Sequence, residues 1–479
     1  MTALWTLDAM AAAMGAEKSG ALPAEVPGLS IDTRTIGKGE AFFAIKGDNR
    51  DGHDFVDAAL KAGAGLAVVA RAKRERFAAD VPLLIVADVL EALRDLARAA
   101  RARSDARIVA VTGSVGKTST KEALRLALAA DGETHASAAS YNNHWGVPLS
   151  LARCPQSAKY AVFEIGMNHA GEITPLAKLV RPHVAIVTSI APVHLEYFGS
   201  LKKIADAKAE IFSGFGPGGI AVINRDIRQY SQLMRAAAAA GAARVVSFGV
   251  HAKANARLLR CSLQPESSTV DAIILGQAVT YKLGAPGKHL VLNSLAVLAT
   301  VSVIGADLAL AALALDTLKP AAGRGVRASL RIPGGSALLI DESYNANPAS
   351  MAAAIALLGQ APVGPHGRRI AVLGDMLELG SQGRALHRAL AESIAAAGID
   401  LVFCSGPLMQ ALFEALPSSR RGGYAETAAA LEPALLAAIR DGDAVMVKGS
   451  LGSKMGLIVK ALEREFARPA ALDQAAQDA

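Results

Sequence analysis

The stretch "VTGSVGKTSTKE", Val111 to Glu122, indicates how the centre of the chain folds. It begins at the end of an apolar run, "RIVAVT" (107–112), and leads into a helical pattern that extends to about residue 130. A strand, a glycine-rich loop and a helix in this order place backbone N–H groups around a phosphate at the helix N-terminus. A standard Walker A loop has a glycine where this chain has Val111, so we expect a nucleotide on a shorter loop.

The composition is that of a globular protein. The chain has 479 residues, of which 52% are hydrophobic and 19% charged, and this length predicts about three domains. The net charge of +7 is spread over short basic clusters such as 71–76 and 98–103, and neither contains an aromatic residue. We interpret these clusters as solvated helix faces and expect no nucleic-acid partner, although the positive balance also suits an anionic substrate.

The location of the protein follows from its cysteines and apolar stretches. The three cysteines lie far apart without CxxC spacing, which is typical of a reducing compartment and argues against disulfides and thiolate metal sites. The N-terminal residues lack the basic segment of a signal peptide. The most apolar stretch, 290–315, is interrupted by polar and glycine residues, so it predicts two buried helices. We therefore expect a cytoplasmic protein without membrane insertion.

Short apolar strands alternate with helical patterns along most of the chain. Residues 30–70 indicate a small α/β unit, and a helix is expected over about 88–103. Further strands are predicted at 107–112, 160–166, 184–190, 219–225, 337–343, 369–375, 401–406 and 443–450. This alternation is typical of doubly wound, mostly parallel sheets, which bind ligands at the carboxyl ends of their strands.

We therefore expect an α/β protein of three domains. Residues 1–85 form a small α/β domain, and residues 86–318 form a central domain that carries the phosphate loop on a doubly wound, mostly parallel sheet. A Pro/Gly-rich stretch at 318–325 marks the boundary to a C-terminal Rossmann-like α/β domain, 319–479. The closing residues 467–479 are expected to fray.

Charged residues follow the loop on successive predicted strands. Lys117 is placed to reach the β- and γ-phosphates, and the Thr118 hydroxyl is placed to hold Mg²⁺. Glu164 ends the next strand, where a carboxylate helps such a threonine hold the metal. His194 follows a further strand, and Lys208 comes fourteen residues later in a helical pattern. A lone His or Lys is more often structural or solvated, but their order on successive strand ends indicates a catalytic set.

Further motifs extend this pattern over the chain. They are "YNNHWGVPLSL" (141–151), "EIGMNHAGEI" (164–173), "HLEYFGS" (194–200), "DAKAEIF" (206–212), "GKHLVLNSLA" (287–296), "GR" (323–324), "DESYNANPASM" (341–351), "LGDMLELG" (373–380) and "VKGS" (447–450). Together with the loop they resemble the Mur ligases, which are ATP-dependent amide-forming enzymes of peptidoglycan precursor synthesis. The resemblance covers about residues 30–460, and the family loop is commonly TG-x-x-GKT, without the Walker glycine.

Within the family, "YNANP" and "GDMLELG" are similar to the branch that joins D-alanyl-D-alanine to UDP-N-acetylmuramoyl-tripeptide. The Asp-Asn-Pro-Arg motif usual in the branch that adds the third residue does not occur in the chain. The resemblance implies that ATP phosphorylates the terminal carboxylate of the tripeptide and that the dipeptide amine displaces phosphate from the acyl phosphate. It also implies that the first domain binds the UDP moiety, that the last domain contacts nucleotide and dipeptide, and that the enzyme is a monomer.

The resemblance also implies two Mg²⁺ ions. Thr118 and Glu164 would hold the first ion, and His194 would hold the second. Lys208 matches a lysine that the family carbamylates with CO₂, which turns a cation into an anion able to support the second ion. The alternative is an unmodified Lys208 that touches phosphate as a point charge.

The remaining ligand contacts are carried over residue by residue. The resemblance implies nucleotide contacts by Thr112, Gly113, Ser114, Val115, Gly116, Lys117, Thr118, Ser119, Asn293, Arg324, Asp341, Tyr344 and Asn345. It implies substrate contacts by Thr33, Arg34, Asp48, Asn49, Arg50, Asn142, Asn143 and Asn347. The alternatives are turn-forming roles for the asparagine pair and for the first-domain residues, and a buried asparagine bonded to backbone at position 293.

The sequence leaves the third residue of the tripeptide open, either diaminopimelate or lysine. It also leaves open the role of Glu342, where many relatives have a shorter acid. Two other functions compete with the ligase. The first is another ligase of the superfamily, such as folylpolyglutamate synthase, against which "YNANP" argues. The second is a regulatory P-loop ATPase, which has no reason to keep His194 and Lys208 at this spacing.

Overall fold

The N-terminal part of the chain forms a small α/β unit. The structure is a computed structural model that describes residues 3–138 and 140–466, so the tail expected to fray, 467–479, lies outside the described residues. A five-stranded sheet has the order β2-β7-β6-β5-β4 and is parallel except for the pair β2–β7. The elements are β1 (Trp5–Thr6), α1 (Leu7–Met14), β2 (Glu17–Ser19), β3 (Glu25–Val26), β4 (Leu29–Ser30), β5 (Ala41–Phe43), α2 (Val56–Lys61), β6 (Leu66–Ala70) and β7 (Leu83–Val86).

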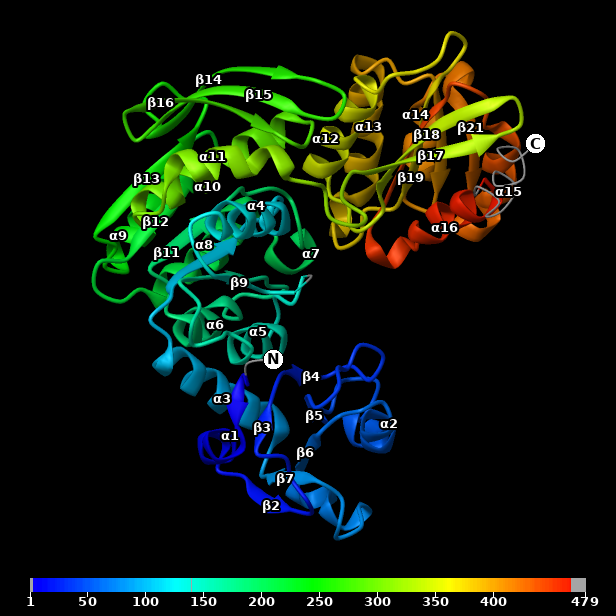
Figure 1. Cartoon of the computed structure of the whole chain (residues 1–479). Helices are drawn as coiled ribbons and strands as arrows, with labels where there is room; N and C mark the ends of the chain where they lie inside the picture. Colours follow the sequence, from blue (N-terminus) through cyan, green and yellow to red (C-terminus); the bar gives the residue numbers. More distant parts are fainter. Residues whose placement is uncertain (1–2, 139, 467–479) are drawn as a thin grey trace, which may run out of the picture.

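The central unit is built on a nine-stranded sheet in the order β16-β15-β14-β13-β12-β11-β8-β10-β9 (Figure 1). Its strands are β8 (Arg107–Thr112), β9 (Thr134–Ala136), β10 (Tyr160–Glu164), β11 (Val184–Val187), β12 (Ile220–Asn224), β13 (Arg244–Gly249), β14 (Ala256–Leu263), β15 (Ser268–Ile274) and β16 (Gln277–Leu283). The pairs from β9 to β14 in this order are parallel, which confirms the doubly wound, mostly parallel sheet.

Helices cover the central sheet. They are α3 (Val89–Arg103), α4 (Lys117–Ala129), α5 (Gly146–Ala152), α6 (Ile173–Val180), α7 (Leu195–Phe198), α8 (Leu201–Ala209), α9 (Tyr230–Ala239), α10 (Lys288–Val303) and α11 (Leu308–Ala314). The last two occupy the apolar stretch predicted to form two helices. Among the described residues, helix length and apolarity nowhere reach what a membrane crossing requires.

The antiparallel extension β14–β16 was not predicted from the alternation of strands and helices. Successive residues of β15 alternate between buried and partly exposed, which is typical of a strand with one face on the core and one toward solvent. The buried face packs against α10, which lies under both β14 and β15. This meander therefore widens the sheet on the side away from β9.

The C-terminal unit contains a six-stranded sheet in the order β17-β18-β22-β19-β20-β21, parallel except for the hairpin β17–β18. Its elements are β17 (Val326–Ile332), β18 (Gly335–Glu342), α12 (Pro348–Gly359), β19 (Arg369–Gly374), α13 (Gly383–Ala396), β20 (Leu401–Ser405), α14 (Gln410–Ala415), β21 (Arg421–Ala425), α15 (Ala428–Ala438), β22 (Ala444–Lys448) and α16 (Gly456–Glu465). The four strands predicted here are confirmed within one or two residues at each end.

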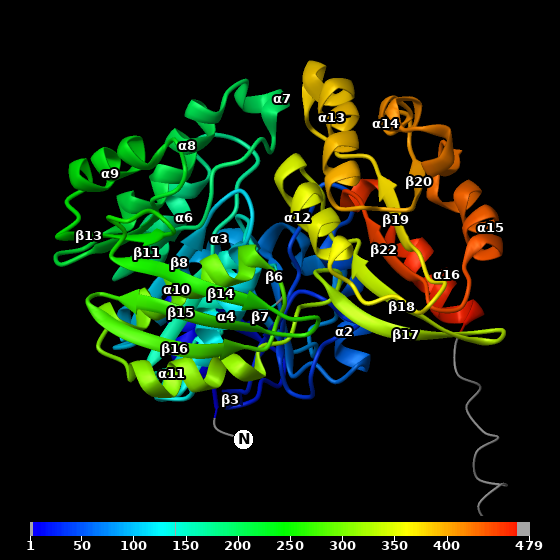
Figure 2. The ribbon, with the colours of Figure 1, turned by 90° about the horizontal axis from the view of Figure 1, so that it is seen from above.

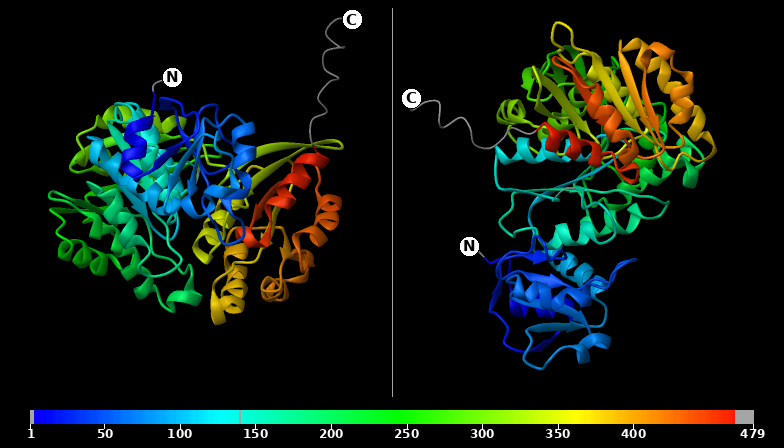
Figure 3. Two further views of the ribbon diagram at one scale, coloured as in Figure 1. Left: turned by 90° about the horizontal axis from the view of Figure 1, so that it is seen from below. Right: turned by 90° about the vertical axis from the view of Figure 1, so that its right-hand side faces the viewer.

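The helix α3 joins the N-terminal unit to the central unit, and the right-hand view of Figure 3 shows the N-terminal unit at one end of the molecule. The Trp5 indole donates a hydrogen bond to the carbonyl of Ala152 (3.0 Å), and the Arg103 guanidinium lies 3.4 Å from the centre of the Trp5 ring. At the other side, α7 faces α12 and α13 of the C-terminal unit (Figure 2).

The domain boundaries stay predictions: 85/86 falls inside β7, and 318/319 falls between α11 and β17.

The buried carboxylate of Asp443 joins the segments that precede β19 and β22 in the C-terminal sheet. Asp443, 1% exposed, accepts hydrogen bonds from the backbone N–H of Arg368 (2.8 Å) and of Arg440 (2.9 Å), and pairs with the Arg368 guanidinium (2.7 Å). We expect Asp443→Ala to lower the free energy of unfolding by about 3 kcal/mol, because it removes the buried acceptor that two backbone N–H groups and the Arg368 guanidinium share. Chemical denaturation measures this; an equal loss in the exposed control Glu426→Ala would contradict the assignment.

Candidate active site

The loop after β8 is shaped by two glycines. Gly113 has φ +151°, and a Cβ there would lie 1.9 Å from Oγ1 of Thr188; Gly116 has φ +88°, and a Cβ there would lie 2.5 Å from Nδ2 of Asn293. Both the backbone conformation and the close approach therefore exclude larger residues. The Asn293 amide also lies 3.5 Å from Oγ of Ser119, so the residue predicted to contact the nucleotide base sits directly against the loop.

Residues that follow β11 brace the loop from behind. The Thr188 hydroxyl donates to the carbonyl of Val115 (2.6 Å), and the Ser189 hydroxyl accepts from the Val115 N–H (3.0 Å). The Ser114 hydroxyl donates to the carbonyl of Ala191 (3.1 Å). Thr188 and Ser189 were missed from the sequence, although the hydroxyl pair directly after an apolar strand was a visible signal. The loop is thus held open at the N-terminus of α4, the arrangement that binds phosphate.

Lys117 occupies the first turn of α4 and reaches back over the loop. Its Nζ donates to the carbonyl of Gly113 at 2.9 Å. Burial lowers the pKa of Lys117, Glu164 opposes this shift, and the charge of Arg324 lowers the pKa further. An anion bound in the loop would relieve both costs, because it supplies the negative charge that the surroundings lack.

Glu164 joins the loop to the segment after β9. Its carboxylate is 1% exposed and accepts from the Thr118 hydroxyl (2.8 Å) at one oxygen and from the Asn142 amide (2.7 Å) at the other. A hydroxyl and a carboxylate side by side are the oxygen donors that Mg²⁺ prefers, so these two residues fit the first predicted metal site. The structure thus brings together three of the predicted site residues.

Lys208 and His194 lie close to Lys117. Lys208, on α8, is 2% exposed, and burial together with the charge of Lys117 lowers its pKa far below the ordinary lysine value. Burial and the charges of Lys208 and Lys117 lower the pKa of His194, and Glu378 opposes this shift. No group of three or more His, Cys, Asp or Glu side chains suited to a metal occurs in residues 3–138 and 140–466. The assignment of His194 and Lys208 to a second metal stays a prediction.

The central and C-terminal units contact each other at His194. Its Nδ1 is hydrogen-bonded to the Glu378 carboxylate, and the backbone N–H of Glu196 donates to the carbonyl of Glu378 (3.2 Å). His194 and Glu378 both have positive φ, +53° and +61°, which is costly for residues with a Cβ. Strained residues of this kind cluster at functional sites. Glu378 lies in the quoted stretch "LGDMLELG", but its contact with His194 could not be read from the sequence.

Two cations of the C-terminal end of the chain have defined partners: Arg324 contacts the segment beside the loop, and Lys448 is held within the C-terminal unit. The Arg324 guanidinium lies 4.2 Å from the centre of the Tyr344 ring and 3.4 Å from the Ser140 hydroxyl, which in turn lies 3.4 Å from the Thr118 hydroxyl. Lys448 at the end of β22 is 2% exposed and donates to Glu342 (3.1 Å) and to the carbonyl of Asn345 (2.9 Å). Glu342, whose role the sequence left open, therefore holds a buried ammonium.

Several predicted contact residues make bonds within their own turns. Asn347 caps α12, Asn143 accepts from the Gly146 N–H (2.9 Å), Asp341 accepts from the Ser343 N–H (3.0 Å), and the Asn345 side chain accepts from the Ala346 N–H (2.8 Å). These bonds are consistent with the turn-forming alternatives. Their roles as ligand contacts stay predictions.

The first-domain residues divide into two groups. Arg34 is exposed and pairs with Asp32 (2.6 Å) beside Thr33, and this pairing lowers the pKa of Asp32 to about 2. The carbonyl of Arg50, next to Asn49, accepts from the Gly47 N–H (2.9 Å), which closes a turn. Asp48 instead lines a groove of 1440 Å³ together with Asn142 and Asn143.

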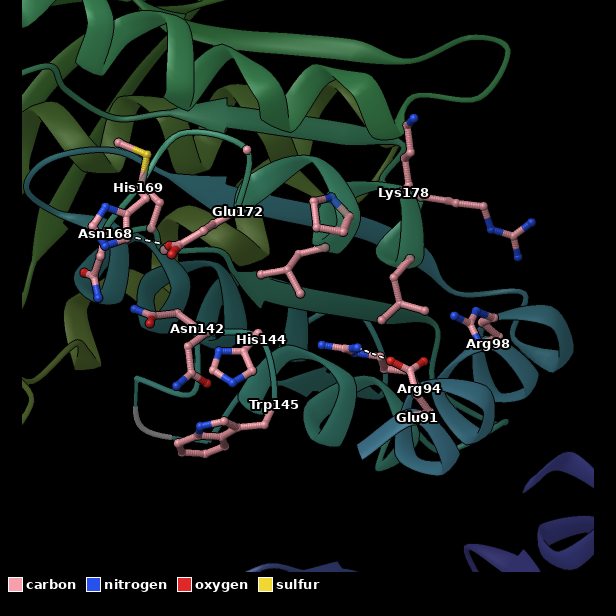
Figure 4. A pocket seen from close by; sticks show the side chains of 18 of the residues that line it. Glu91, Arg94, Arg98, Asn142, His144, Trp145, Asn168, His169, Glu172 and Lys178 are labelled. Carbon is pink, nitrogen blue, oxygen red and sulfur yellow. Dashed lines mark hydrogen bonds and ion pairs between the residues drawn. The ribbon is translucent and has the colours of Figure 1, made fainter. Parts of the chain in front are cut away.

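This groove runs along α6 toward α3 (Figure 4). At one end it is lined by Asn142, His144, Trp145, Asn168 and Glu172, and at the other end Arg98 and Lys178 project into view. Because Asn142 also touches Glu164, the groove opens directly beside the proposed reaction centre.

Three family models cover most of the chain: "Mur ligase family, catalytic domain" matches residues 25–101, "Mur ligase middle domain" 111–301 and "Mur ligase, glutamate ligase domain" 331–451. The chain is 37% identical to the Escherichia coli UDP-N-acetylmuramoyl-tripeptide--D-alanyl-D-alanine ligase over 438 residues, 91% of this chain and 93% of that one. The chain belongs to the Mur ligase family.

Solved structures of Mur ligases agree with this assignment. MurF from Acinetobacter baumannii superimposes with a TM-score of 0.82 at 29% identity, covering 96% of this chain and 99% of that one. MurF ligase from Thermotoga maritima in complex with ADP superimposes with a TM-score of 0.74 at 26% identity, covering 92% and 98%. The three-unit α/β architecture of this Mur ligase is therefore shared with these structures.

The His194–Glu378 contact predicts that the two units of this Mur ligase separate more readily without the carboxylate. We expect Glu378→Ala to shift the open-to-closed ratio by about two- to fivefold, because a part-exposed hydrogen bond between the units contributes about 0.5–1 kcal/mol. Energy transfer between labels on α9 and α15 reports the distance between the units. The exposed control Glu392→Ala should leave the open-to-closed ratio unchanged. The same ratio in both variants would contradict a role of the His194–Glu378 contact in holding the units together.

Proposed function

We propose that this chain is an ATP-dependent ligase that joins D-alanyl-D-alanine to UDP-N-acetylmuramoyl-tripeptide and releases ADP and phosphate. One observation carries the proposal: the half-buried Lys117 of the phosphate loop, the Thr118–Glu164 pair and the groove beside Asn142 converge at the carboxyl ends of β8 and β10. The similarity to relatives of that name over nearly the whole chain supports the same conclusion.

The chemistry explains why cations gather at this point. A free carboxylate is a poor acyl donor, because its leaving group is oxide. A carboxylate oxygen of the tripeptide attacks the γ-phosphorus of ATP, ADP leaves, and an acyl phosphate forms. The dipeptide amine then attacks the carbonyl carbon and loses a proton. The bond between that carbon and the phosphate oxygen breaks, and phosphate leaves with the electron pair. Both steps bring anions together, so charge neutralisation and alignment do most of the catalytic work.

The residues of the chain take distinct roles in this reaction. Lys117 and the N–H groups of the loop bind the phosphates of ATP and offset the charge that shifts to ADP. Arg324 brings a second cation from the C-terminal unit and stacks on Tyr344, which fixes its direction. Asn142 sits between the groove and Glu164 and orients the substrate carboxylate toward the loop.

The metal and carbamate belong to the same proposal. Thr118 and Glu164 would hold one Mg²⁺ and His194 a second, and these ions supply further positive charge to the phosphates. Burial and the charge of Lys117 lower the pKa of Lys208, which favours the uncharged amine, the form that adds to CO₂ with loss of a proton. The resulting carbamate would offset the positive charge of Lys117 and support the second ion.

Closure of the C-terminal unit over the nucleotide is part of the proposal. The connecting segment contains Gly323 and Gly325 with φ +69° and +100°, so a hinge lies where the backbone is free of Cβ constraints. Arg324 and the loop after β19 already contact the central unit, and opening at the hinge would move both away. Closure would keep them in place and exclude water from the acyl phosphate.

Phosphate release tests the function. Purified enzyme with ATP should release phosphate only when UDP-N-acetylmuramoyl-tripeptide and D-alanyl-D-alanine are both present, because each step needs its acceptor. Release that depends on a folate acid and glutamate would favour the folylpolyglutamate synthase alternative. Equal release without any acceptor would favour a regulatory ATPase.

Lys208→Ala tests the carbamate. We expect the variant to lose activity by more than a hundredfold and to regain part of it with added formate or acetate, because a small carboxylate can take the place of the carbamate. Intact-protein mass measured in bicarbonate should show the added CO₂ on the wild type and not on the variant. An unmodified lysine and no rescue would favour the point-charge role.

A further inference from the structure

The groove along α6 ends in a group of cations that the reaction described above does not use. We call this group, Arg98, Arg101, Lys178 and Arg181, the α3–α6 cluster. All four line the groove, and Figure 4 places Arg98 and Lys178 at the end opposite Asn142 and Asn168. Two of them belong to the basic stretch 98–103, which the sequence suggested to be a solvated helix face.

The α3–α6 cluster holds positive charge without a matching negative charge. Arg98 pairs with Asp95 of its own helix, but Arg101, Lys178 and Arg181 form no ion pair with any acid in residues 3–138 and 140–466. Arg101 instead donates to the carbonyls of Val180 (2.9 Å) and Arg181 (3.1 Å). Burial and the charge of Arg181 lower the pKa of Arg101, so the two guanidinium groups repel each other. Crowded like charges of this kind are stabilised by a bound anion.

Arg181 occupies a position at which its side chain is costly. It caps the C-terminus of α6 with φ +48° and ψ +64°, the left-handed conformation in which glycine is the favoured residue. Glycine at this position would remove both the backbone strain and the repulsion with Arg101. The chain therefore keeps a guanidinium where local stability favours its absence, which is typical of a functional residue.

The cluster and the reaction centre share one continuous groove. Arg98 and Arg101 are three residues apart and lie on one side of α3, while Lys178 lies in the last turn of α6 and Arg181 at its C-cap. The eight residues of α6 span about 12 Å, and the groove extends past them to Asn142 beside Glu164. A ligand that fills it must be long and must carry an anionic group far from its reacting end.

We propose that the α3–α6 cluster binds a phosphate or carboxylate group of the UDP-linked substrate at a distance from the carboxylate that reacts. This inference rests on the proposed function, because that substrate is both elongated and multiply anionic. The diphosphate and the non-reacting peptide carboxylates share the required oxyanion chemistry. Their contributions are separated by comparing ligands that carry one group and not the other.

Equilibrium binding tests the cluster without turnover. Trp145 lines the same groove, so its fluorescence reports occupancy, and calorimetry gives an independent Kd. We expect the double variant Lys178→Gln/Arg181→Gln to bind UDP-N-acetylmuramoyl-tripeptide about tenfold more weakly, about threefold for each charge removed, with an unchanged Kd for ATP. Equal weakening of UDP would identify the diphosphate as the bound group; weakening confined to the tripeptide compound would identify the carboxylates.

Two comparisons make the test decisive. The control Lys253→Gln/Arg331→Gln removes the same two residue types from exposed positions outside the groove, in the turn between β13 and β14 and on β17, and should bind like the wild type. Arg181→Gly should raise Tm by about 2 °C while weakening the tripeptide compound about threefold, because it relieves strain and removes charge. A purely structural arginine would not move stability and affinity in opposite directions.

The proposal is overturned if folded variants of the cluster bind the tripeptide compound within twofold of the wild type. In that case a wild type that still releases phosphate with both acceptors leaves the ligase function intact. A wild type that neither binds the tripeptide compound nor releases phosphate with it overturns the ligase function and this inference together.

Discussion

Positive charge buried at the carboxyl ends of the central sheet is the constraint on which the site depends. Lys117 is half-buried in the loop and Lys208 is buried beside it. The charge of Lys117 lowers the pKa of both Lys208 and His194, and Glu164 is the carboxylate that opposes the lowered pKa of Lys117. Burying like charges costs free energy that the chain alone does not recover. The arrangement becomes favourable when phosphates or metal-bound phosphates enter, so the same feature that destabilises the empty site selects its ligands.

The C-terminal unit contributes to the charge balance of the site through a small number of contacts. Arg324 adds a cation that Tyr344 orients, and Glu378 adds an anion that reaches His194. Buried Lys448 binds Glu342 and the carbonyl of Asn345, so it ties the end of β18 to the segment that carries Tyr344. The balance of charge at the reaction centre therefore changes when the units move apart, which makes their separation and the chemistry interdependent.

Sequence patterns were sufficient for features whose signal is local. The strand, loop and helix around Gly113, most parallel strands of both large sheets and the two helices in 290–315 each produce a short periodic or glycine-rich pattern. The parallel strands β9, β13 and β21 were not predicted. The meander β14–β16 was missed because its alternating faces are set by packing on α10, which lies later in the chain. The contact between His194 and Glu378 spans 184 residues and depends on how two units sit together, which spacing does not encode. In contrast, the bonds of Asn143 and Asn347 join residues only three positions apart, so the sequence could name the turn-forming alternative.

Asn142 links the groove to the phosphate loop through a single carboxylate. Its amide occupies one oxygen of Glu164 while the Thr118 hydroxyl occupies the other, and both distances are short. A substrate carboxylate that takes the Asn142 amide as its own donor frees that oxygen of Glu164, and the freed negative charge then faces Lys117. Occupation of the groove would thus raise the affinity of the loop for a cation and for the nucleotide bound with it, because the two sites compete for one hydrogen-bond donor. Such coupling requires no movement of the sheet, only the exchange of one hydrogen bond at the place where the groove and the loop meet.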